Sequence, residues 1–429
     1  MVPTSISQIA TLIIFIISYI LIFSGKVDRT TAALFGVFLM LSAGYAFHFM
    51  TFEEALGHVD WEVILLLFGM MTFVGQLAKT GFFKYLGIKA IKLSGGKLWL
   101  LFVYLTLLTT FVSMVIDNVT TILLMIPLTV EVSEMLEISP VPLILGEAIL
   151  SNIGGVATMI GDPPNILIAY ASKYSFNAFI YHLFLPVLVS LFFSLLIGKF
   201  VYRGWLRRKP KNIERIMELD PAEYVKNEKL MHYLLIVLFF MILFFALQDY
   251  LHISPAFVAL IGGTLSLVIT MEDPKKAFEA VEWPTLVFFI ALFMLVGGLE
   301  ETGLLADLAR ALSSLSSDPL YTAILILWVS GITSSFVDNI PITAAFIPVV
   351  AVMTGTYHTG LLWWALAMGV GLGGNITPIG SSAGVISISL SRRYGYSITN
   401  KHWFSFGSLV AFVSMLVGTA FLFLLQYMG

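Results

Sequence analysis

The sequence contains no cysteine and few charged residues, and these two deficits exclude several classes of protein. None of the 429 residues is a thiol, so disulfides, thiolate metal sites and cysteine-dependent catalysis are ruled out. Charged residues make up 11% of the chain, against roughly 25% in a soluble domain. Hydrophobic residues make up 59%. A chain of this composition lacks the polar residues to cover a surface that faces water.

Signals for nucleic acid, nucleotide and export are also missing. The net charge of −3 provides no basic surface for nucleic acid, and no G-x-x-x-x-G-K-[ST] motif indicates an ATP site. The first residues, MVPTSISQIATLIIF, lack a positive n-region, so we expect a retained first helix and not a cleaved signal. No cofactor is expected, and any driving force has to come from an ion gradient or a separate ATPase.

Long apolar runs dominate what is present, and many reach the length that spans a bilayer core of about 30 Å. They predict an all-α polytopic membrane protein. In the first half the runs are 9–25, 31–48, 62–78, 98–116, 119–136, 141–175 and 182–202. In the second half they are 232–248, 255–271, 285–299, 320–337, 340–354, 361–390 and 403–427. The only long polar stretch, 203–231, is predicted to be a linker.

The two halves repeat one another in residues as well as in hydropathy. VIDNVTTILLMIP at 115–127 matches FVDNIPITAAFIP at 336–348, and GGVATMIGDPPN at 154–165 matches GGNITPIGSSAG at 373–384. Four further residues match in the same order: Trp61, Gly75, Thr80 and Gly81 with Trp283, Gly297, Thr302 and Gly303. This pattern indicates an internal duplication, with repeats at 1–202 and 232–429.

The membrane topology follows from the pair of apolar arms that precedes the interrupted run in each half. If each pair is a re-entrant helical hairpin, each half crosses the membrane five times, and the odd number inverts the second repeat. Of the 23 Lys and Arg, all but Lys173 and Arg310 then lie on the side of the linker. The positive-inside rule therefore predicts a cytoplasmic linker and both termini outside, in the cell membrane.

Each half also contains a polar interruption inside an apolar run. In IGDPPN at 160–165, two prolines break the helix and remove backbone donors. Irregular backbone is tolerated at membrane depth only where it is buried in protein or lines a wet cavity. A broken helix exposes half-helix ends, which attract ions. GGNITPIGSSAG at 373–384 is interpreted in the same way, so each half is predicted to contain one broken helix.

The hairpin tips carry the dipeptides Asp117-Asn118 and Asp338-Asn339 between apolar arms. An ionised Asp at mid-membrane costs ~2.5–3.5 kcal/mol on insertion scales. A plain turn between two full helices is the alternative explanation. Two matched copies, each followed by a broken helix, favour one cavity near the midplane. The predicted site residues are Asp117, Asn118, Thr120, Thr158, Gly161, Asp162, Asn165, Asp338, Asn339, Asn375, Thr377, Gly380, Ser381 and Ser382.

Two further features leave alternatives open. Glu147 is an intramembrane acid matched to Leu366, and it is either a proton carrier or a satisfied acid in helix packing. GSSAG at 380–384 fits the G-x-S-x-G pattern of serine hydrolases. Because Ser382 matches Pro163, however, the shared helix break already explains these glycines. We therefore expect no enzyme.

The matched motifs resemble the ion transporter superfamily over nearly the whole chain. They are most similar to its arsenite permease and sodium–proton antiporter branch (ArsB/NhaD type), which includes the P protein and plant silicon exporters. The dicarboxylate branch carries Ser-Asn-Thr at its tips and binds sodium with the anion. Here Asp117 and Asp338 stand in the serine positions, and Val119 and Ile340 replace the threonine. This departure argues against a dicarboxylate, and equally against citrate, because two acids would repel an anion.

The resemblance implies a secondary transporter that works by alternating access in the lipid bilayer, and a homodimer is possible. We expect proton-coupled efflux of arsenite or antimonite, with Na⁺(Li⁺)/H⁺ antiport as the alternative and a passive channel as a third class. Asp117 and Asp338 are expected to bind the proton or cation, with Asn118 and Asn339 orienting the substrate. Possible Na⁺ sites are Asp117, Asn118 and Gly161 in the first half, and Asp338, Asn339 and Gly380 in the second.

Overall fold

The computed structural model describes residues 4–24, 26–304, 307 and 318–428, and over these residues all regular structure is helical. By length and composition, ten of the described helices can cross a membrane. They are not the same ten segments as the predicted crossings. The hairpin helices α7 (Asn118–Met135), α18 (Pro319–Phe336) and α19 (Asn339–Tyr357) qualify, whereas helices that end at a break are shorter.

The chain is a polytopic all-α membrane protein with two repeats and a short linker between them. The other helices of the first half are α1 (Thr4–Ser24), α2 (Arg29–Phe47), α3 (Phe52–Gly57), α4 (Trp61–Lys79), α5 (Phe82–Ser94), α6 (Leu98–Ser113), α8 (Val141–Val156), α9 (Pro163–Ser172) and α10 (Phe176–Val201). The linker contains α11 (Arg203–Leu206), α12 (Ile213–Glu218) and η1 (Pro221–Tyr224).

The second half repeats this order. Its other helices are α13 (Glu228–Leu251), α14 (Pro255–Thr270), α15 (Pro274–Ala277), η2 (Phe278–Ala280), α16 (Trp283–Glu301), α20 (Leu361–Gly373), α21 (Ser382–Arg393), α22 (Asn400–Trp403), η3 (Phe404–Ser408) and α23 (Leu409–Met428). Helix α13 begins at Glu228, inside the range predicted for the linker. As predicted, α6 and α7 form one hairpin and α18 and α19 the other, while α8–α9 and α20–α21 are broken helices.

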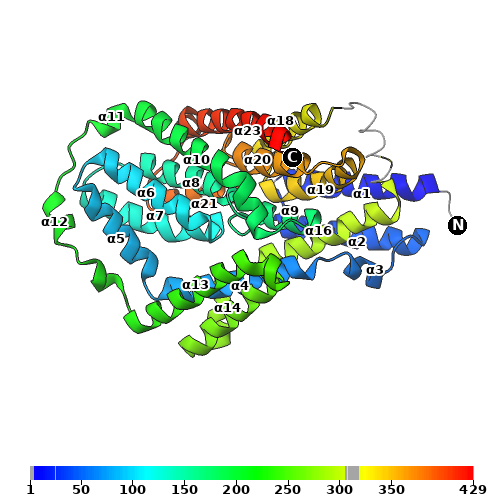
Figure 1. Cartoon of the computed structure of the whole chain (residues 1–429), viewed down its shortest axis with the longest axis horizontal. Coiled ribbons are helices and arrows are strands. Elements are labelled where there is room, and N and C mark those ends of the chain that lie inside the picture. The colour runs from blue at the N-terminus through cyan, green and yellow to red at the C-terminus, as the bar shows by residue number, and fades with distance from the viewer. Residues whose placement is uncertain (1–3, 25, 305–306, 308–317, 429) are drawn as a thin grey trace.

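The helices pack into two groups (Figure 1). We call α5–α10 with α18–α23 the hairpin unit, because it holds both hairpins and both broken helices. We call α1–α4 with α13–α16 the frame. Within the frame, helices exchange partners between the repeats: α14 packs along α4, and α2 packs along α16. The two groups touch mainly through α16 with α19, α4 with α5 and α9, and α10 with α13.

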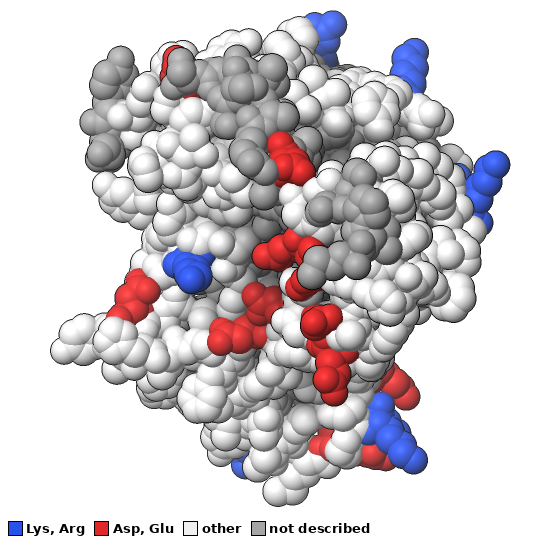
Figure 2. All heavy atoms as spheres, turned by 90° about the vertical axis from the view of Figure 1, so that its right-hand side faces the viewer, with Lys and Arg blue, Asp and Glu red and all other residues white. Residues whose placement is uncertain are grey.

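The two ends of the molecule differ in charge. The linker lies at one end and the N-terminus at the other (Figure 1). At the linker end, Lys79 pairs with Glu272 at 2.7 Å, and this hydrogen bond lowers the pKa of the Glu272 carboxyl. The opposite end shows acidic side chains along a central strip (Figure 2). Helix ends there carry Glu53, Glu54, Asp60, Glu62, Glu300 and Glu301. The predicted cytoplasmic side of the linker stays a prediction, and Arg310, predicted to lie on the other side, is outside the described residues.

Candidate functional site

Each hairpin tip is tied to the broken helix of its own repeat by the same hydrogen bond. Thr158, in the first break, donates from Oγ1 to the Met114 carbonyl at 2.5 Å. Its match Thr377 donates from Oγ1 to the Ser335 carbonyl, which is the match of Met114. Both threonines therefore hold the site together, and they do so at equivalent positions. The duplication inferred from sequence is visible at the level of single contacts.

The glycines of the two breaks permit close backbone approach. A Cβ added to Gly161 would lie 2.5 Å from the Ser113 carbonyl oxygen, and one added to Gly380 would lie 2.5 Å from the Gly374 carbonyl oxygen. Real Cβ atoms do not come this close to backbone oxygen. Both positions therefore require glycine for packing of the break against its surroundings.

Both hairpin tips converge on one carboxylate. Asp162, in the first break, is 1% exposed. Its Oδ1 accepts a hydrogen bond from Asn118 Nδ2 at 3.2 Å, and its Oδ2 accepts one from Asn339 Nδ2 at 3.1 Å. The two tip asparagines, far apart in the chain, thus bind the same group. The two tips and the first broken helix therefore meet at Asp162, and the ion-binding role predicted for these groups stays a prediction.

A buried asparagine that the sequence analysis missed completes the centre. Asn152, on α8, is fully buried and accepts from Asn118 Nδ2 at 2.9 Å. Its own Nδ2 donates to Asn375 Oδ1 at 2.7 Å and to Ser381 Oγ at 2.8 Å. It therefore links the first hairpin to the second broken helix. Its position in SNIGG, just before the glycines that precede the break, was the available signal.

The tip acids Asp117 and Asp338 occupy matched positions but bond differently. Asp117 is half-buried and accepts a hydrogen bond from the backbone N–H of Thr120 at 2.8 Å, so it caps its own helix α7. Asp338 makes no capping bond to α19. It instead pairs with Arg29 and accepts from Ser382 Oγ at 2.7 Å.

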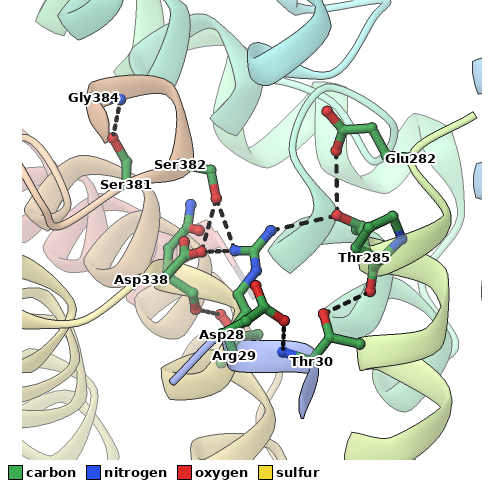
Figure 3. Close-up of polar contacts among 12 residues, drawn as sticks. Asp28, Arg29, Thr30, Glu282, Thr285, Asp338, Ser381, Ser382 and Gly384 are labelled. Carbon is green, nitrogen blue, oxygen red and sulfur yellow. Dashed lines mark hydrogen bonds and ion pairs between the residues drawn. The ribbon is translucent and has the colours of Figure 1, made fainter. Parts of the chain in front are cut away.

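Arg29, Glu282 and Thr285 extend the second-half cluster into the frame (Figure 3). Arg29 also donates to Ser382 Oγ at 3.0 Å and to Thr285 Oγ1 at 3.4 Å, and Thr285 Oγ1 donates to Glu282 at 3.2 Å. The sequence analysis named none of the three as site residues. One signal was available, because Glu282 precedes Trp283 as Asp60 precedes its match Trp61.

Asn165 was predicted to belong to the site, but it does not line the cavity between the tips. It donates to the carbonyls of Gly155, Val156 and Thr158 at 3.2, 3.0 and 2.9 Å, and so binds the free end of α8.

Glu147 does not line the cavity either. It is fully buried, accepts from Thr129 Oγ1 at 2.6 Å, and has no described partner at Oε2.

The groups enclose a cavity of ≈ 10 Å³, about the room that one water molecule needs. The site is therefore closed in this conformation. Three carboxylates and one guanidinium are among the lining groups. Within the described part of the chain, no three His, Asp or Glu side chains converge tightly enough to chelate a metal ion. The lining residues are Arg29, Met71, Asp117, Asn118, Val119, Asp162, Pro163, Glu282, Thr285, Asn339, Ile340 and Ser382.

Comparison with known proteins places this geometry in context. The sequence model described as Citrate transporter matches residues 19–369. The 46 kDa membrane protein of Mycobacterium leprae is 36% identical over 97% of this chain and 98% of its own length. An uncharacterized transporter of Mycobacterium tuberculosis is 37% identical with the same coverage. The human P protein is 31% identical over 94% of this chain, which spans 58% of that protein.

A solved structure shares the fold. The YdaH transporter of Alcanivorax borkumensis, described as having an unusual topology, superposes with a TM-score of 0.60 over 87% of this chain and 88% of that one. The identity is 14%, so this likeness concerns the fold alone. Relatives and fold are those of transporters, which agrees with the expectation that the chain is not an enzyme.

Proposed function

The chain belongs to the citrate transporter family, and we propose that it is a secondary transporter that exchanges a small cation for protons around Asp162. Membership of a transporter family supports the transport of a small solute across the bilayer. One observation carries the finer assignment: both hairpin tips and the first broken helix meet at a single buried carboxylate.

The charge of the cavity favours a cation. Asp117, Asp162 and Glu282 line it, and Arg29 is its only basic lining residue. Arg29 is already paired with Asp338, next to the cavity. Since charges interact strongly where water is excluded, the remaining carboxylates attract a cation or hold a proton and repel a free anion.

The hydrogen bonds around Asp162 suggest how a proton and a cation exclude one another. In the closed site the amide nitrogens of Asn118 and Asn339 donate to the carboxylate. An asparagine side chain carries both donors and an acceptor oxygen. When a cation binds Asp162, the two amides turn their oxygens toward it. When a proton binds, the carboxyl no longer attracts a cation, so one site serves both partners in alternation.

Two other substrates, arsenite or antimonite and citrate, are the alternatives to a small cation. The arsenite or antimonite prediction stays a prediction, and the family assignment does not single out the arsenite permease branch. Citrate, which the sequence analysis ranked lower, is favoured by the description of the family. Because three carboxylates line the cavity, citrate would have to enter together with a cation that offsets its charge.

The test uses purified protein in liposomes with a preset pH gradient and a fluorescent internal pH dye. Na⁺, Li⁺, citrate with and without Mg²⁺, and arsenite are added in separate arms. We expect saturable collapse of the gradient by an inorganic cation alone, lost in Asp162→Asn and kept in the control Glu53→Gln, which alters an exposed acid in α3. A response to citrate or arsenite with none to cations alone would overturn the cation assignment.

A further inference from the structure

Arg29 occupies a position that is unfavourable for a cation. It is the first residue of α2, where the backbone N–H groups give the helix end a partial positive charge. The preceding Asp28 caps this end by accepting from the backbone N–H of Thr30 at 2.9 Å and of Thr31 at 3.2 Å. Asp28 therefore satisfies the helix end, and local helix chemistry gives no reason for an arginine there. The positive-inside rule accounts for a basic residue on this side of the membrane, and the contacts of the side chain show a more specific use.

The guanidinium joins the frame to the hairpin unit. On its own side it donates to Thr285 of α16 and lies over the Phe288 ring, 5.6 Å from the centroid. Across the boundary it pairs with Asp338 at the second hairpin tip and donates to Ser382 at the start of α21. The Arg29 and Asp338 side chains are 28% and 18% exposed, so water screens this pair only in part. Figure 3 shows the contacts with Thr285, Asp338 and Ser382 converging on the guanidinium.

The sequence of the second tip leaves Asp338 available to this arginine. In the first tip Asp117 caps α7 by accepting from the backbone N–H of Thr120. The matched residue in the second tip is Pro341, which has no N–H to donate. Asp338 accordingly makes no capping bond to α19. Among the described residues nothing hydrogen-bonds its Oδ1, although this atom is buried.

We propose that Arg29 is an internal counter-cation that latches the second hairpin tip to α2 and α16 until the transported cation or a proton binds Asp338. This inference rests on the proposed function, because it names a second element of the same cation and proton site. The charged groups around Asp338 are Arg29 and Asp28 of the α2 end, Glu282 before α16, Asp117 of the first tip and Asp162 of the break.

The latch gives the exchanger a means of coupling. An antiporter has to prevent its empty site from crossing the membrane, because such crossing dissipates the gradient. With Asp338 ionised and empty, the Arg29 pair holds the hairpin unit against the frame. A proton or a cation on Asp338 removes the attraction and releases the tip. Only a loaded site then changes conformation.

The first experiment tests the latch without any transported substrate. Because the chain has no cysteine, Ile340→Cys introduces a single thiol at the second tip. Val119→Cys is the matched control at the first tip, and both residues are buried and line the same cavity. We expect Arg29→Gln to raise the maleimide reaction rate at position 340 about tenfold, with less than about twofold change at position 119. Equal changes at both tips would mean a general loss of structure, and no change at either would overturn the latch.

The second experiment measures cation affinity and coupling in liposomes. Arg29→Gln removes a competitor for Asp338, so we expect apparent cation affinity to rise roughly tenfold while the protons moved per cation fall. A residue with only a structural role would weaken affinity. Arg29→Lys, which keeps the charge without the planar fork, is expected to restore part of the coupling. In the double variant Arg29→Gln/Asp338→Asn, the gain in affinity should disappear.

The two proposals fail in different ways. If the wild-type protein shows no cation–proton exchange but the thiol at position 340 still reacts faster in Arg29→Gln, the proposed function fails and the contact remains as a latch of unassigned use. If exchange is present but Arg29→Gln leaves affinity, coupling and labelling unchanged, the proposed function stands and the latch is wrong.

Discussion

The two hairpin tips carry the same dipeptide and use its acid in opposite ways. Asp117 caps its own helix and pairs with no basic side chain among the described residues, whereas Asp338 leaves its helix end uncapped and pairs with Arg29. The difference traces to the residue three positions on, Thr120 in one repeat and Pro341 in the other. Because Pro341 lacks the backbone N–H that Thr120 provides, the acid of the second tip remains available for an ion pair, whereas the acid of the first tip caps its helix.

The same asymmetry extends through both breaks. Asp162 in the first break matches Ser381 in the second, so only one repeat places a carboxylate at the centre. Asn165 binds the α8 end, while its match Gly384 has no side chain to do so. In the second repeat Trp403 Nε1 donates to the Asn375 carbonyl at 3.0 Å, the position matched to Val156. The scaffold is conserved between the repeats, and the charges are not.

The largest expected effect comes from changing the two matched residues Asp162 and Ser381. Asp162→Asn is expected to lower cation affinity about 100-fold, because it removes the charge that both tips contact. Ser381→Ala, the matched change, removes the hydrogen bond from Asn152 and the N-cap bond from the Gly384 N–H but no charge, and should cost about fivefold. Cation-dependent collapse of a pH gradient in liposomes measures both. Equal losses would show that the two breaks contribute alike.

Exchanging Thr120 and Pro341 between the tips tests whether the capping bond decides how each acid is used. Pro341→Thr restores a donor for Asp338, so it should weaken the Arg29 pair and give labelling and affinity between wild type and Arg29→Gln, a shift of about threefold. Thr120→Pro removes the cap of Asp117 and is the reciprocal control. If Pro341→Thr changes neither the labelling rate nor the cation affinity, the missing cap is not what makes Asp338 available to Arg29.

The matched acids before α4 and α16 give a smaller contrast. Glu282 lines the closed cavity, whereas Asp60 caps α4 by accepting from the Glu62 and Val63 N–H groups. Glu282→Gln should therefore lower cation affinity about threefold to tenfold in the gradient assay. Asp60→Asn should leave affinity within about twofold, since Asn also caps helices. The reverse order would indicate that the cavity described here is not where the cation binds.

Glu147 and its match Leu366 give the smallest expected effect. The acid does not line the cavity and accepts from Thr129. Glu147→Gln keeps its size and an acceptor, so we expect less than about twofold change in exchange rate. A lost pH dependence of exchange in this variant would restore the alternative that Glu147 carries protons.

The order of elements was predictable because each one is local in sequence. Apolar runs, the breaks at IGDPPN and IGSSAG, and the tips Asp117-Asn118 and Asp338-Asn339 could all be read without tertiary contacts. The convergence of Asn118 and Asn339 followed from the matched repeats. Arg29 was counted only as one basic residue on the linker side, because its partners lie more than 250 positions away. Such a contact depends on packing between repeats, which no local pattern reveals.

The exchange of frame helices between the repeats has a consequence for biosynthesis. Helix α4 packs along α14, and α2 along α16, so the first repeat cannot bury these surfaces until α14 and α16 of the second repeat have been synthesised. Contacts between segments far apart in the sequence slow folding, and an incomplete chain exposes the helix surfaces that will later be buried. At translation rates of about 5–20 residues per second, the exposed interval lasts on the order of ten seconds or more. A ribosome that pauses in the linker would lengthen this interval. Degradation of the stalled nascent chains would then show how far α2 and α4 depend on α14 and α16 for their stability.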